Sequence, residues 1–234
     1  MRKRWLDRFI QAKNTPEQRQ LRRGADRCID MACLNRMALG VCFSEERDLL
    51  SQWRGYAEDG RGYAITFHRE RLEEVAKENS SNGLELTKIA YGGKDIDEIN
   101  SIARTLGETF MADAERYEAA NGVGYISVDW DAARIPYEKA ARSLFTVKNG
   151  AFHEEKEWRL FTYGTLSSFE GVKLRGTGNA LSPYLPVAIP TDSVARVTLG
   201  PVNKTPEHVL EFALESNGFN DVYVSQSRAS YQTR

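Results

Sequence analysis

Residues 42–67 hold more side chains with a definable structural role than any other part of the chain. Ser44 is a favoured N-cap residue, and the acidic residues after it would lie where a first helical turn exposes unpaired N–H groups. Apolar residues then recur at helical spacing, and two of them are the large aromatic residues Trp53 and Tyr56. The pattern predicts a helix that begins at Ser44 and packs one face against a core.

A tight turn and a strand are expected directly after this helix. Residues 59–62 have the sequence DGRG, and glycines adopt positive φ more readily than other residues. In Tyr63–Phe67, bulky and small side chains alternate, which is the period of a strand covered on one face. Residues 42–67 therefore predict a helix, a turn and a strand in succession.

This segment resembles the signature of the bacterial family called domain of unknown function 2971. The resemblance continues through KNGAFHEEKEWRLF at residues 148–161, VTLGP at 197–201 and VYVSQSRASYQ at 222–232. By the order of these motifs, the family is identified as distantly similar to ADP-ribosyltransferases. Such enzymes break the bond between nicotinamide and ribose in NAD, so the resemblance implies NAD as a substrate.

Composition favours one domain with a buried core. The chain has 234 residues, of which 41% are hydrophobic and 28% charged, and its formal net charge is -1. So small a charge argues against attraction of the whole surface to nucleic acid or membrane. No apolar run approaches the ~20 residues that cross a bilayer, and the three cysteines have no paired spacing that indicates disulfides or a zinc site. We therefore expect a single cytoplasmic domain over residues 1–234, without membrane association and without a metal.

The chain is predicted to be α+β, with a basic helical segment at residues 1–40 and an α+β core at 41–234. The basic face of the first segment is a candidate contact for nucleic acid, and a solvated helix face is the alternative. Strands and helices do not alternate regularly in the core, which favours a mixed or antiparallel sheet with packed helices. The other predicted helices cover residues 68–79, 95–120, 130–147 and 206–217, and the other predicted strands cover 84–91, 157–163, 172–175, 185–189, 194–199 and 222–225.

Two neighbouring carboxylates are the strongest candidates for chemistry. In an extended strand, Glu155, Glu157 and Arg159 would project from one face, while Trp158 and Leu160 enter the core. Like charges on one face raise the proton affinity of one carboxylate unless a cation or a ligand compensates. Paired carboxylates suit glycosidic cleavage, in which one of them stabilises an oxocarbenium-like transition state. A solvated sheet face with internal ion pairs is the structural alternative.

The resemblance implies roles for these residues. Several ADP-ribosyltransferase families carry Glu-x-Glu at the start of a strand, and residues 155–157 resemble it. Glu157 would then be the catalytic carboxylate on the nicotinamide ribose, Glu155 would orient the nucleophile, and Arg159 would be the neighbouring cation. The expected NAD contacts, between the predicted helix and this strand, are a polar residue, two stacking rings and two phosphate-binding arginines: Ser44, Trp53, Tyr56, Arg54 and Arg61. Such an enzyme would be a toxin or defence effector that modifies an unidentified macromolecule or small molecule.

Two other hypotheses belong to different classes of protein. Glu154-Glu155-Lys156 fits a Glu-x-Lys pattern, and Asp129 or Asp131 could complete the magnesium site of a nuclease. The third hypothesis is a non-catalytic module that binds protein or nucleic acid through the basic segment. Calorimetry with NAD, and then with magnesium or manganese, distinguishes the three.

Overall fold

The computed structural model describes residues 36–92, 142 and 145–231. The helices expected in residues 1–35 and 95–120, most of the helix expected at 130–147, and both Asp129 and Asp131 lie outside the described residues. The chain divides into two compact units, and the larger one comprises Ala38–Ile89, Ala151–Tyr163 and Ser167–Arg234. In the smaller unit, strand β4 (Ala90–Tyr91) pairs in parallel with β5 (Val147–Lys148).

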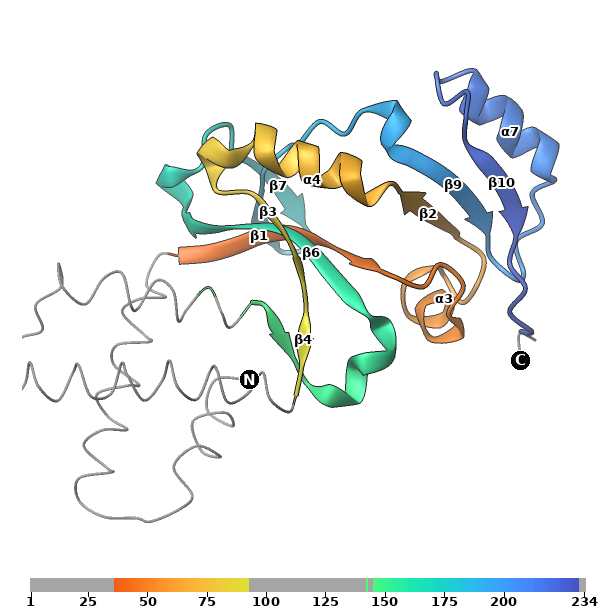
Figure 1. Cartoon of the computed structure of the whole chain (residues 1–234), viewed down its shortest axis with the longest axis horizontal. Coiled ribbons are helices and arrows are strands. Elements are labelled where there is room, and N and C mark those ends of the chain that lie inside the picture. Colours follow the sequence, from red (N-terminus) through yellow and green to blue (C-terminus); the bar gives the residue numbers. More distant parts are fainter. Residues whose placement is uncertain (1–35, 93–141, 143–144, 232–234) are drawn as a thin grey trace, which may run out of the picture. The chain divides into compact units, whose positions relative to one another are not determined.

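The first sheet of the larger unit has three strands in the order β1–β6–β3. Its strands are β1 (Arg36–Ser44), β3 (Glu85–Lys88) and β6 (Glu157–Thr165). β3 runs antiparallel to β6, and helix α4 (Arg69–Glu78) lies along one face of the sheet (Figure 1). The core is found there, because Val75 and Ala76 of α4 pack against Leu84 and Leu160. Strand alternation places Glu157 and Arg159 on the face opposite to Leu160.

The second sheet is mixed, with the strand order β10–β9–β2. Its strands are β2 (Tyr63–Phe67), β9 (Val194–Leu199) and β10 (Tyr223–Gln226). β2 runs antiparallel to β9 and β10 runs parallel to it. Helix α7 (Glu207–Glu215) flanks β10 (Figure 1). The predicted α+β class with a mixed or antiparallel sheet is therefore confirmed for the described residues.

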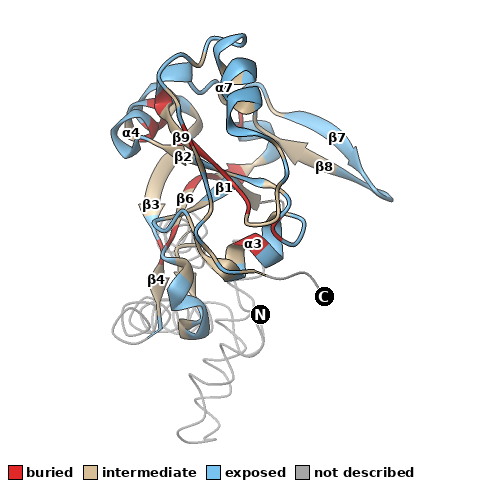
Figure 2. Cartoon of the chain, turned by 90° about the vertical axis from the view of Figure 1, so that its right-hand side faces the viewer, coloured by how far each residue is buried: buried red, intermediate tan, exposed pale blue. Residues whose placement is uncertain are grey.

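The remaining elements are short. They are helix α3 (Leu50–Tyr56), the antiparallel hairpin of β7 (Lys173–Thr177) and β8 (Ala180–Tyr184), and the 3₁₀ turns η1 (Ser80–Asn82), η2 (Gly150–Glu155), η3 (Leu166–Ser168) and η4 (Thr191–Ser193). Figure 2 shows buried residues along β9 and β6, whereas the hairpin is largely exposed. None of the helices in the described residues is long and apolar enough to cross a membrane.

Three local predictions are wrong. The helix begins at Leu50, and Ser44 is instead the last residue of β1. The Ser44 hydroxyl accepts a hydrogen bond from the N–H of Glu46 at 3.1 Å and donates one to the Glu155 carbonyl at 2.8 Å. It therefore links the end of β1 to a distant segment of the chain instead of capping a helix. Residues 36–40, expected as the end of a helix, belong to β1. The strand expected at 185–189 lies earlier, at β8, where pairing with β7 fixes its register.

Two glycines permit close backbone approaches. A Cβ atom on Gly200 would lie 2.2 Å from the Gly60 carbonyl oxygen, and one on Gly40 would lie 2.6 Å from the Cβ atom of Phe161. Neither distance is possible for real atoms, so any larger residue would displace backbone. Gly200 therefore allows the turn after α3 to dock on the end of β9.

Asp48 joins α3 to the segment after β10. It lies before α3, and its Oδ1 accepts hydrogen bonds from Trp53 Nε1 at 2.7 Å and from Ser227 Oγ at 2.5 Å, while Oδ2 accepts the N–H of Arg228 at 2.8 Å. Trp53 is only 2% exposed. The carboxylate therefore satisfies the indole of a core residue and fixes the C-terminal segment, which we define as residues 227–231.

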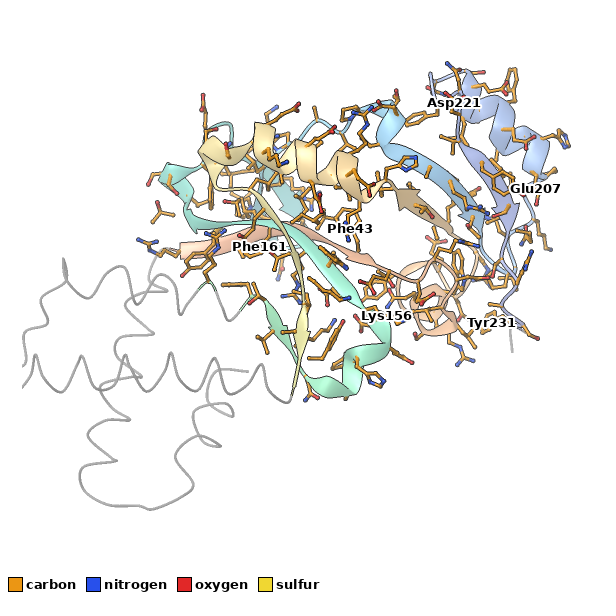
Figure 3. The ribbon with its side chains drawn as sticks, in the orientation of Figure 1. Phe43, Lys156, Phe161, Glu207, Asp221 and Tyr231 are labelled. Atoms are coloured by element: carbon orange, nitrogen blue, oxygen red, sulfur yellow. The ribbon has the colours of Figure 1, made fainter. Side chains whose placement is uncertain are left out.

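A second set of contacts holds the other end of the C-terminal segment. The Tyr231 hydroxyl donates to Asp59, and the Arg54 guanidinium lies 5.2 Å from the centre of the Tyr231 ring. Figure 3 shows Tyr231 beside α3. The segment thus covers α3 and the turn that follows it.

Acid should weaken this part of the structure. Burial acts to raise the pKa of Asp48, but hydrogen bonds from Ser227, Trp53 and the Arg228 N–H outweigh it and lower the pKa below 3.8. Because the folded-state pKa is the lower one, the stabilisation is complete above the unfolded-state pKa and is lost as the pH falls through the folded-state value. Asp48→Asn should lower the free energy of unfolding by about 1–3 kcal/mol at neutral pH, and urea titrations should find this difference reduced in acid. A difference that is constant from neutral pH to pH about 3 would contradict the assignment.

Candidate functional site

Two segments that the sequence marked as functional lie side by side. Ser44 donates to the backbone of Glu155, and the N–H of Glu45 donates to the carbonyl of Lys156 at 3.2 Å. Lys156 has a φ of +42°, so the chain turns sharply between η2 and β6. The turn ends η2 at Glu155 and lets β6 begin at Glu157.

Charged side chains surround Trp158 on the face of β6 that carries Leu160. Trp158 Nε1 donates to Glu45 Oε1 at 2.8 Å, and Lys88 Nζ contacts the same oxygen at 2.6 Å. The hydrogen bonds from Lys88 and Trp158 lower the pKa of Glu45. The Arg69 guanidinium lies 5.5 Å from the centre of the Trp158 ring. Trp158 is therefore half-buried, and the prediction that it enters the core is wrong.

The opposite face of β6 carries a buried ion pair. Glu157 is 3% exposed, and Arg159 Nε lies 2.6 Å from Glu157 Oε1. Burial lowers the pKa of Arg159, but the hydrogen bond and the charge of Glu157 outweigh burial and raise it above its usual range. The two residues are consecutive on one face because a strand repeats every second residue. Their predicted proximity is confirmed, but Glu157 is buried rather than open on a sheet face.

Cys42 of β1 is the neighbour of this pair. Burial, together with a hydrogen bond and repulsion from Glu157, raises the pKa of the Cys42 thiol, and Arg159 only partly opposes this. The thiolate is the reactive form of cysteine, so a raised pKa disfavours Cys42 as a nucleophile. It acts here as a polar neighbour of the ion pair.

Glu155 does not lie in the strand that was predicted to contain it. It is the last residue of η2 and precedes β6, so the alternation that was expected to align it with Glu157 does not apply. The structure brings it close to Ser44 through its carbonyl group. Ser44, Glu155, Glu157 and Arg159 thus belong to adjoining segments.

The other predicted NAD contacts lie on α3 and the turn after it. Trp53 is a core residue whose indole donates to Asp48, so its predicted packing against the core is confirmed and its expected role as a stacking platform is wrong. Arg54 stacks on Tyr231. Tyr56 is 77% exposed, so the prediction that its ring faces the core together with Trp53 is wrong. The Arg61 side chain is exposed, and its carbonyl accepts a hydrogen bond from Asn203 Nδ2 at 2.6 Å.

The structure describes only some of the residues of the nuclease hypothesis. Glu154 is exposed in η2, and Lys156 Nζ pairs with Glu46 at 2.5 Å. Figure 3 shows Lys156 at the start of β6. Across residues 36–92, 142 and 145–231, no group of three or more His, Cys, Asp or Glu side chains could hold a metal ion.

Sequence reasoning missed Asp48 and Cys42 as neighbours of the candidate residues. Asp48 is one of the acidic residues expected in a first helical turn, but it binds the C-terminal segment. Cys42 is one of the three cysteines without paired spacing. Alternation along β1 predicts which side chains share a face with Cys42. Only the strand order shows that β6, which carries Glu157 and Arg159, is the neighbouring strand.

The fold and the site define an α+β protein. Its larger unit contains two three-stranded sheets, and one of them carries a buried acid–arginine pair. Residues 52–160 match the family described as Protein of unknown function (DUF2971). The family resemblance is thereby confirmed over a stretch that includes Trp53, Glu157 and Arg159. No curated protein and no solved structure matches the chain.

Proposed function

We propose that this chain is an NAD-using enzyme with ADP-ribosyltransferase-like chemistry and that Glu157 is its catalytic carboxylate. The observation that supports the proposal is the buried pair of Glu157 and Arg159. Desolvation offsets much of the attraction in a buried ion pair, so such a pair adds little to stability compared with apolar residues. Charged groups in buried positions with a specific partner are candidates for functional sites.

The roles follow from the charges. As the bond between nicotinamide and ribose breaks, nicotinamide leaves with the bonding electron pair and the ribose carbon becomes positive. The carboxylate of Glu157 stabilises that charge, and Arg159 holds the carboxylate in position. Glu155, beside Ser44, orients the nucleophile. Water as nucleophile gives ADP-ribose, and a macromolecular or small-molecule acceptor gives an ADP-ribosylated product.

Three of the predicted NAD-binding side chains keep that role in the proposal. Tyr56 is exposed and offers a ring for stacking, while Arg54 and Arg61 are exposed cations suited to phosphates. Ser44 supports Glu155 instead of binding NAD directly. We place the protein in the cytoplasm, because a reducing compartment keeps a free thiol such as that of Cys42 reduced. We propose that it acts there as a toxin or defence effector.

Release of nicotinamide from NAD by the purified chain, without added metal, tests the proposal. Release that follows enzyme concentration is the expected result. The absence of both nicotinamide release and NAD binding by calorimetry would overturn it.

The same assays separate the alternatives. Cleavage of nucleic acid that needs magnesium or manganese, and that is lost in Glu154→Ala and in Lys156→Ala, would identify a nuclease. Nucleic-acid or protein binding without any cleavage, lost when the basic residues of segment 1–40 are neutralised, would identify a binding module.

A further inference from the structure

One face of the second sheet combines an arginine with several hydroxyl groups. Thr66 of β2 pairs with Arg196 of β9, and Arg196 pairs with Tyr223 of β10. In the adjacent row, Thr198 of β9 pairs with Ser225 of β10. Residues that are paired across strands, or two apart along a strand, share a face. We call these five residues the hydroxyl face.

The arginine of the hydroxyl face is held in place without a carboxylate. Its guanidinium lies 4.2 Å from the centre of the Tyr223 ring, and its Nη1 donates to Ser225 Oγ at 3.4 Å. Within the part of the chain that the structure describes, Arg196 forms no salt bridge. A half-buried guanidinium that is oriented by an aromatic ring and has no anionic partner is suited to bind an anion.

The hydroxyl groups around Arg196 have hydrogen-bonding capacity that their protein neighbours do not fully satisfy. Thr198 Oγ1 and Ser225 Oγ are 3.4 Å apart, well beyond the usual ~2.8 Å between bonded hydroxyls. The Thr66 hydroxyl oxygen is buried and has no hydrogen-bond partner among the described residues. Leaving a buried hydroxyl unpaired is unfavourable, and each such group in a native structure calls for an explanation. An anion bound beside Arg196 would supply acceptors for these groups.

We propose that the hydroxyl face binds the phosphate group of a small molecule. Phosphate offers several acceptor oxygens, so it can engage the planar guanidinium and hydroxyls from three strands at once. All these protein groups can donate, and none of the five residues is acidic, so an anion meets attraction from each. The site lies on the second sheet and does not use Glu157, so it stands independently of the proposed NAD chemistry.

Thermal melts of the full chain at constant ionic strength test this site. Inorganic phosphate should raise the Tm in a saturable way, because a ligand that binds only the folded state stabilises it. Chloride at the same ionic strength is the reference. Arg196→Gln should weaken phosphate binding by about tenfold or more, the effect of losing one charge-assisted hydrogen bond. AMP and diphosphate tested in parallel distinguish a nucleotide from a free phosphate.

Thr66→Val gives a second, independent signature. It removes the unpaired hydroxyl at constant shape, so the variant should melt at a higher temperature than the wild type without phosphate and should bind phosphate less tightly. Ser193→Ala is the matched control, because Ser193 Oγ is the other buried hydroxyl without a partner in the described residues and lies outside the hydroxyl face. Its phosphate affinity should equal that of the wild type.

Three results would overturn the proposal. They are a phosphate effect no larger than that of chloride, an unchanged phosphate affinity in Arg196→Gln, or an unchanged affinity in Thr66→Val. If Arg196→Gln does not fold, the Thr66→Val measurement decides alone.

Discussion

Glu157→Gln should lower the rate of nicotinamide release from NAD by roughly 10²–10³-fold, the usual effect of removing one preorganised electrostatic group from a transition state. Glutamine keeps the shape of the side chain and can still accept a hydrogen bond from Arg159. It lacks the negative charge that stabilises the oxocarbenium ion. The loss should therefore appear in kcat, while the affinity for NAD changes little.

Glu154→Gln is the matched control for this measurement. Glu154 lies three residues before Glu157 and is exposed in η2, so the same chemical change there should leave nicotinamide release unaltered. The melting temperature of Glu157→Gln must be compared as well, because the variant removes the negative charge that pairs with Arg159. A folded Glu157→Gln protein with wild-type kcat would remove Glu157 from the mechanism.

Trp53→Ala should lower the free energy of unfolding by about 3–5 kcal/mol, the usual range for deleting a large aromatic side chain from a core. The indole is 2% exposed and donates to Asp48. The substitution therefore leaves a cavity and also removes a hydrogen bond from the carboxylate that fixes the C-terminal segment. Urea unfolding monitored by circular dichroism measures the effect.

Tyr56→Ala on the same helix is the control for Trp53→Ala. The Tyr56 side chain is 77% exposed, so its removal should change stability by no more than about 0.5 kcal/mol. Unfolding curves of Trp53→Ala and the wild type that coincide would show that α3 does not depend on its buried indole.

Strands with a clear local pattern were predicted at their observed positions. The predicted bounds of β2 and β9 are those of the structure, Tyr63–Phe67 and Val194–Leu199. In β2 the alternation of side chains is strict, and in β9 a short apolar strand stands between turn residues, so both signals lie within the strand itself. The α+β class follows from such local signals.

Predictions failed where a distant segment decides the local structure. Ser44 and the acidic residues after it match a helix start, but pairing of β1 in the first sheet extends the strand through Ser44. The backbone at Lys156 adopts positive φ, which separates Glu155 from the alternation of β6. Neither event has a signal within a few residues of the position concerned.

The candidate site could be predicted only in part. Glu157 and Arg159 were found because both lie on one strand, two residues apart. The placement of Trp158 beside Glu45 was missed, because the partner comes from a segment far away in the sequence. The burial of Trp53 was predicted correctly, but the NAD-stacking role expected for it was wrong for a related reason. An aromatic residue at helical spacing has the same pattern in a core and in a ligand site, and only the segments that cover it distinguish the two.

The hydrogen bond between Asp48 and Ser227 also has a consequence for the kinetics of folding. The two residues are 179 positions apart in the chain, so this contact closes a loop that spans most of the molecule. The entropy of closing a loop grows with its length, and contacts of high sequence separation slow folding. Trp53 shares the same carboxylate. Closing this long-range contact therefore also sets the surroundings of the Trp53 indole.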